Sequence, residues 1–183
     1  SWKLGGWYNT NEYTEVISPS PDLRAAIATS GNWSLYAILD QLLWRPAGQE
    51  DGGIGGFLRV MGAPGNRNAV SFFLDAGLTW KGMIPARPDD TAGIGLGYAQ
   101  MGRPLRDAAA AEAALTPGFP RQSGEYVLEL SYQAVVVPGW TLQPVVQYIA
   151  RPGGGITDPI PGGPPDRRIG NETVLGLRST MTF

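Results

Sequence analysis

The chain has 183 residues, a net charge of -2 and only 16% charged residues, and it contains neither cysteine nor histidine. The missing residue types exclude a disulfide framework and remove the commonest general base and the commonest zinc ligand. The balanced charge provides no basic patch, so nucleic acid is not an expected partner, and neither a metal nor a cofactor is expected.

Eight segments of the chain alternate apolar and polar residues with the period of two that predicts β-strands. Several are about twice as long as a typical globular strand of about 5–6 residues. In chain order, the predicted strands are 2–9, 33–45, 53–61, 70–81, 92–101, 126–137, 140–149 and 172–183. In the second of them, Gln41 falls on the apolar side and Trp44 on the polar side.

The segment 70–81 shows the pattern most clearly, with an uncharged apolar row that ends on Trp80 and a polar row that includes Asp75 and Lys81. Such rows, closed by Trp or Tyr, are typical of outer-membrane barrels. Lipid offers no water to pair backbone groups, so spanning strands must close on themselves. We therefore predict an all-β, transmembrane antiparallel β-barrel of about eight strands, one domain over residues 1–183, in a Gram-negative outer membrane.

One stretch, Leu130 to Ala150, carries no charge and is long enough to cross a bilayer as a helix. Pro138 and Gly139 stand in its middle, however, and Val, Tyr and Trp are frequent in it. The pattern favours two strands joined by a tight turn, and we predict no transmembrane helix. Pro144 removes one ladder donor, which predicts a bulge or a locally weak pairing.

The connections are expected to alternate between the two sides of the membrane. With the C-terminus at the periplasmic rim, 10–32, 63–69, 102–124 and 151–170 lie outside, and 46–52, 82–91 and 138–139 are periplasmic. The Ala-rich stretch Arg106 to Leu115 predicts a short helix in an outer loop. The adjacent acids Glu50-Asp51 and Asp89-Asp90 are interpreted as solvated turn residues.

Several segments resemble the C-terminal half of the carbohydrate-selective porins of the OprB type: 36–45, 75–82, 142–149, Pro152 to Gly155, and 175–183. The resemblance extends over nearly the whole chain. It implies a barrel of about sixteen strands that lets glucose and similar sugars diffuse passively across the outer membrane. Family members are roughly twice as long, so the chain is expected to be a half-barrel. Phe183 resembles the signal that the outer-membrane assembly machinery reads. Sugars, outer-membrane lipids and that machinery are the expected partners, and the oligomeric state stays open.

A porin needs no catalytic residues, but its lumen must exchange hydrogen bonds with a passing solute. Charged and amide side chains suit sugar hydroxyls, and the aromatic Tyr36, Phe57 and Phe73 suit apolar C–H faces. Each candidate has the alternative role of a structural residue in a charge network. The substrate-binding candidates on the lumen side are Asp40, Arg59, Asp75, Lys81, Glu129, Gln133, Gln143, Gln147 and Arg178. Gly93, Gly95 and Gly97 share that side and either leave room in the pore or ease strand curvature. The cluster Gly153 to Gly155 is interpreted as a turn.

Three other classes of protein share some of these sequence features. A soluble β-sandwich, such as a carbohydrate-binding or adhesin module, also alternates, but its strands are usually shorter and its outer face more charged. A complete eight-stranded barrel would be filled by its own side chains. An outer-membrane enzyme is disfavoured because most such mechanisms use a histidine base.

Overall fold

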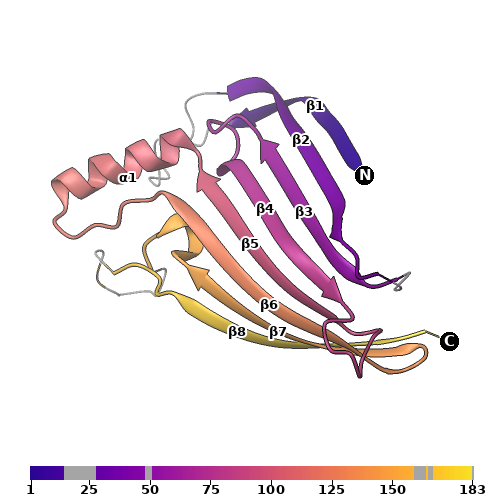
Figure 1. The fold of residues 1–183 in the computed structure, drawn as a ribbon. Coiled ribbons are helices and arrows are strands. Elements are labelled where there is room, and N and C mark those ends of the chain that lie inside the picture. The colour runs from indigo at the N-terminus through magenta and orange to yellow at the C-terminus, as the bar shows by residue number, and fades with distance from the viewer. Residues whose placement is uncertain (15–27, 48–50, 159–163, 165–166, 183) are drawn as a thin grey trace.

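The computed structural model describes residues 1–14, 28–47, 51–158, 164 and 167–182 (Figure 1). Eight long strands dominate it, and each prediction of a strand from the sequence is confirmed. The elements are β1 (Trp2–Thr14), β2 (Ala28–Trp44), β3 (Gly53–Gly62), β4 (Val70–Lys81), β5 (Thr91–Met101), α1 (Arg103–Leu115), β6 (Gly124–Val137), β7 (Trp140–Ala150), the 3-10 turn η2 (Pro152–Gly154) and β8 (Glu172–Met181).

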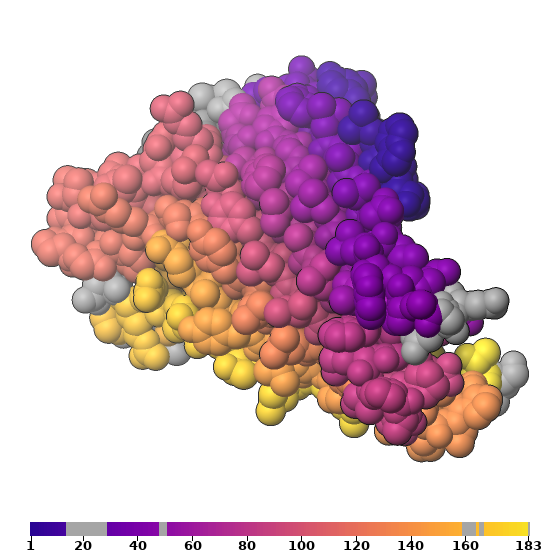
Figure 2. Space-filling view, viewed as in Figure 1, coloured from indigo at the N-terminus to yellow at the C-terminus, as the bar shows by residue number. Residues whose placement is uncertain are grey.

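The strands form one antiparallel sheet in which each strand pairs with the next one along the chain, from β1 to β8. The sheet is twisted and curved, and the sequence runs across it as one continuous wall (Figures 1 and 2). Two packed sheets are not present in the described part of the chain, so the β-sandwich alternative is wrong. β1 and β8 are the two edge strands of this sheet.

The connections fall into two groups at opposite ends of the strands. The long-loop end carries 63–69, α1 with the segment that follows it, and η2 (Figure 1). The short-turn end carries 45–47 and 51–52, the segment 82–90 and the turn Pro138–Gly139. Gly139 has a positive φ of 83°, which glycine adopts without strain, and its carbonyl accepts a hydrogen bond from Thr182 N at 2.8 Å.

The described residues do not form a buried apolar core like that of a soluble globular domain. Only Met101 and Ala109 are buried apolar side chains among them, whereas Leu175 and Leu177 are 77% and 71% exposed. Large apolar side chains on an outer surface mark an interaction site or a membrane contact. The burial pattern therefore matches a wall that meets lipid on one face.

Two expectations from the sequence need correction at β1 and β2. β1 continues to Thr14 and β2 begins at Ala28, both beyond the predicted ends. The two strands continue to pair there after a register shift between Asn9 and Glu12. A second shift between Leu42 and Trp44 inserts an extra residue in β2. This bulge moves Trp44 from the predicted polar side to the apolar side, opposite Ile54. Gln41 stays on the apolar side, as predicted.

Helix α1 confirms the helix predicted in the connection between β5 and β6, and it begins three residues earlier, at Arg103. Pro104 is compatible with that start because a proline in the first turn loses no intrahelical hydrogen bond. No helix in the described ranges is long and apolar enough to cross a membrane. The stretch Leu130 to Ala150 forms the second half of β6 and all of β7. The ladder between these strands is interrupted opposite Pro144 and keeps the same register on either side of the gap, so the pairing there is weak but contains no bulge.

Candidate functional site

The nine candidate residues share one face of the sheet, although they come from six strands. The register places Arg59 opposite Asp75, Glu129 opposite Gln147, and Gln143 opposite Arg178. Asp40 lies opposite Phe57. Lys81 lies opposite Thr91, which in turn lies opposite Gln133. We call this surface the polar face.

The other surface, the apolar face, carries aliphatic rows bounded by aromatic rings. At the short-turn end, Trp44 and Trp80 meet edge to face with ring centroids 6.4 Å apart. Toward the long-loop end, Tyr98 and Tyr126 lie 4.8 Å apart. Aromatic rings at both ends of an apolar band are the arrangement of barrel strands at the two membrane interfaces.

In β6 and β7, exposure distinguishes the two faces as the inner and outer sides of a curved wall. In β6, Val127 and Glu129 on the polar face are half-buried, whereas Leu128 and Leu130 on the apolar face are exposed. In β7 the same alternation separates half-buried Gln147 from exposed neighbours. Side chains on the inner side of a curved sheet converge and shield one another, so the polar face is the inner one.

The best-defined cluster on the polar face joins β3 and β4 around Arg59. Its Nη1 donates to Asp75 Oδ2 at 3.0 Å, and the guanidinium carbon lies 4.9 Å from the centre of the Phe57 ring. The Phe57 ring lies over Gly77, where an added Cβ would stand 2.6 Å from the ring. The carboxylate and the ring together hold the guanidinium in one orientation, while half of the Arg59 side chain remains exposed.

A second cluster on the polar face joins β6 and β7. Gln147 Nε2 donates to Glu129 Oε2 at 2.6 Å. Between the two clusters, β5 contributes Gly95 and Gly97 to the same face, so bare backbone separates them. An added Cβ at Gly95 would meet only the Ala76 carbonyl, at 3.9 Å. Local packing therefore does not require this glycine.

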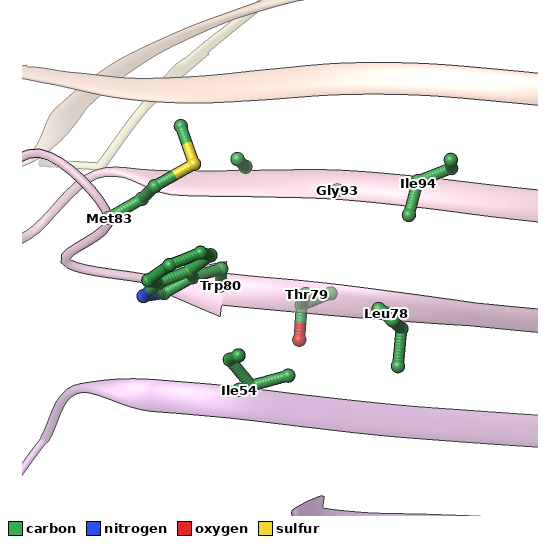
Figure 3. A pocket seen from close by; sticks show the side chains of 8 residues that line it. Ile54, Leu78, Thr79, Trp80, Met83, Gly93 and Ile94 are labelled. Atoms are coloured by element: carbon green, nitrogen blue, oxygen red, sulfur yellow. The ribbon is translucent and has the colours of Figure 1, made fainter. Parts of the chain in front are cut away.

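Two hollows lie on opposite faces of the sheet near the short-turn end. The hollow on the polar face has about 350 Å³ and is lined by Asp40, Phe57 and Thr79 among others. The hollow on the apolar face has about 220 Å³ and is lined by Ile54, Trp80 and Met83 among others (Figure 3). Thr79 lines both hollows, but only the first also has a charged side chain, Asp40, so only the first belongs to the candidate site.

The long-loop end contributes a carboxylate that the sequence analysis missed. Glu125 Oε2 accepts a hydrogen bond from the backbone N of Gly153 at 2.7 Å and so ties η2 to the start of β6. Glu125 precedes the predicted strand by one residue, and it continues the odd-numbered polar row of β6. Extending the alternation by one residue would have found it. Gly153 to Gly155 form the predicted turn, all with positive φ.

The short-turn end corrects the interpretation of Asp90 as a solvated turn residue. Asp89 is exposed as expected, but Asp90 is only 3% exposed. Its carboxylate accepts hydrogen bonds from the Arg87 side chain, from the Tyr132 hydroxyl at 2.6 Å and from Val135 N at 2.9 Å. Chiefly the Arg87 hydrogen bond, and then those from Tyr132 and Val135, hold the pKa of Asp90 well below its usual range against the effect of burial.

The described residues contain no group of acidic side chains that could hold a metal ion. The polar face instead offers separate ion pairs and amides on a rigid wall. Such a surface can exchange hydrogen bonds with a neutral, hydroxyl-rich solute and release it again.

Comparisons with known proteins agree with this arrangement. A solved structure described as the high pH structure of Pseudomonas putida OprB superposes with a TM-score of 0.80 and 26% sequence identity. The match covers 100% of this chain and 44% of that one, so the chain spans less than half the length of that porin. A comparison with curated protein sequences found no match. The sequence model of the carbohydrate-selective porin, OprB family, matches residues 1–183, and the chain therefore belongs to that family.

Proposed function

We propose that the chain forms part of the wall of a pore through which glucose and similar sugars diffuse passively across a Gram-negative outer membrane. The family and the fold are those of a transport channel rather than an enzyme. In this proposal the polar face is the wet lumen and the apolar face contacts lipid. The separation of charged and aliphatic side chains onto opposite faces of each strand supports it.

The observation that best supports a sugar as the solute is the cluster of Phe57, Arg59 and Asp75. Arg59 has five guanidinium N–H donors, and among the described residues only one hydrogen bond, that to Asp75, uses them. The remaining donors and the second oxygen of Asp75 suit the hydroxyl groups of a sugar, which both donate and accept. The bare backbone at Gly95 and Gly97 leaves space beside the cluster.

The pore as a whole needs more wall than these eight strands. Eight strands enclose an interior just wide enough for their own side chains. The match to less than half of the P. putida porin supports a larger barrel, of which this chain is one part. In the proposed orientation the short-turn end is periplasmic. The assembly signal at Phe183 lies outside the described residues and stays a prediction.

The test is planar-bilayer recording of glucose block on the pore-forming polypeptide that contains this chain. Arg59→Ala is expected to weaken the glucose block about tenfold, the effect of losing one hydrogen bond to a charged group. Arg59→Lys keeps the charge but loses the planar fork and the stacking, so it is expected to restore little of the block.

The matched control is Arg103→Ala. Arg103 also forms an ion pair, with Asp107 at 3.3 Å, but on the exposed surface of α1 and away from the polar face. It is expected to leave glucose block unchanged. Unaltered glucose affinity in Arg59→Ala, or an equal effect in Arg103→Ala, would contradict the assignment of the sugar path to this cluster.

A further inference from the structure

Strand β6 extends farther toward the short-turn end than its neighbour β5. The pairing of the two strands ends where Gln133 lies opposite Thr91, the first residue of β5. β6 nevertheless continues to Val137 and pairs with β7 on its other side, with Val135 opposite Thr141. The edge of β6 beyond Gln133 therefore has no neighbouring strand from β5 to pair with.

Val135 lies two residues beyond Gln133 on that edge, and both of its backbone groups are paired with side chains of the turn 82–90. Its N–H donates to Asp90 Oδ1 at 2.9 Å. Its carbonyl accepts from an Nη atom of Arg87 at 2.9 Å. In an antiparallel ladder, a residue of the neighbouring strand supplies the same two groups, one acceptor for the N–H and one donor for the carbonyl.

The two side chains are held to each other and to the turn that carries them. Arg87 contacts Asp90 through Nε and through Nη2, the latter at 3.1 Å. Tyr132 donates its hydroxyl to Asp90, and Gly82 N donates to the Asp90 carbonyl at 2.9 Å, which closes the turn. Figure 1 shows this turn beside the end of the β6–β7 hairpin.

We propose that the ion pair of Arg87 and Asp90 acts as a side-chain substitute for a strand, pairing the edge of β6 where β5 has ended. Unpaired backbone groups are costly at a membrane rim and invite pairing with other chains. The substitute lets the β6–β7 hairpin project beyond β5 with its edge closed. It also explains why the turn 82–90 is longer than the two-residue turn at the same end.

The test is hydrogen exchange at single amides, measured by NMR on the pore-forming polypeptide in detergent micelles. Asp90→Ala removes the acceptor for Val135 N–H and is expected to speed its exchange by at least about tenfold. The amide of Leu128, in the middle of β6, is expected to keep its rate. The control Asp75→Ala breaks a different ion pair, that between Asp75 of β4 and Arg59 of β3. Neither of these side chains is bonded to a backbone group in the described part of the chain, so the control is expected to leave the exchange rate of Val135 unchanged.

A second variant covers the case in which Asp90→Ala does not fold. Arg87→Met removes the donor to the Val135 carbonyl and the main anchor of Asp90, but leaves the carboxylate itself. Faster exchange at Val135 in this variant, with Leu128 unchanged, supports the proposal. An unchanged Val135 rate in either folded variant overturns it, as does an equal acceleration in Asp75→Ala.

Discussion

Two aromatic side chains on the polar face cover glycines of neighbouring strands. Phe57 covers Gly77, and Tyr36 covers Gly5, where an added Cβ would stand 2.4 Å from the tyrosine hydroxyl oxygen. A ring laid over a glycine covers exposed backbone and pins the register between the two strands. It also keeps the ring against the wall, so the space in front of the sheet stays open to solutes.

Gly77→Ala is expected to lower the free energy of unfolding by about 1–3 kcal/mol. The added Cβ would stand 2.5 Å from the Ile94 carbonyl oxygen, which is backbone and cannot move aside, as well as 2.6 Å from the Phe57 ring. The control Gly95→Ala has open space and is expected to be neutral or to gain up to about 1 kcal/mol. Urea unfolding from lipid vesicles measures both, and equal losses would show that the ring–glycine contact is not needed.

At the scale of elements, each strand presents one row of side chains on the apolar face and one on the polar face. In β6 the adjacent residues Val127 and Leu128 are both aliphatic, but Leu128 lies between Leu96 and Tyr148 on the apolar face. Val127 lies between Gly97 and Ile149 on the polar face. The two positions therefore share a depth and differ only in the face that they occupy.

Leu128→Arg is expected to destabilise the folded protein by about 2–4 kcal/mol, the cost of an arginine on the lipid face near the bilayer centre. Val127→Arg, at the same depth but near Glu129 and an open glycine, is expected to cost much less. Folding yields in bilayers, followed by heat-modifiable migration on gels, measure the difference. Similar yields for both variants would mean that the inner and outer faces are wrongly assigned.

At the scale of the whole molecule, the sheet ends in two edge strands. β8 is exposed along its entire length, including Leu175 and Leu177 on the apolar face. In lipid, the unpaired N–H and C=O groups of such an edge cost several kcal/mol each. The two edges therefore mark where further strands of a larger barrel would pair.

The 183-residue chain alone is expected not to give a stable glucose-sensitive conductance in planar bilayers. A chimera in which the remaining strands come from the P. putida porin is expected to conduct, with glucose reducing its ion current, because both edges then find partners. Glucose-sensitive conductance from the short chain by itself would contradict the larger barrel.

The sequence alone determined the order and approximate positions of the strands and, apart from the bulge in β2, which side chains share a face. Alternation with a period of two is a local property, because successive side chains of any strand point to opposite sides. It was therefore enough to place Arg59, Asp75 and Glu129 on one face and Leu128 on the other. The helix of the β5–β6 connection was likewise predictable from its run of alanines.

The tertiary structure decided which of these residues meet. Arg59 contacts Asp75, and Glu129 contacts Gln147, because the register between neighbouring strands sets them opposite each other. The sequence of one strand does not determine its register with the next. The bulge that turns Trp44 toward the apolar face arises in the same way from its pairing with β3. Asp90 is the clearest case: its sequence neighbours indicate a solvated turn, but its partner Val135 lies 45 residues away and is brought beside it only when β5 ends before β6 does.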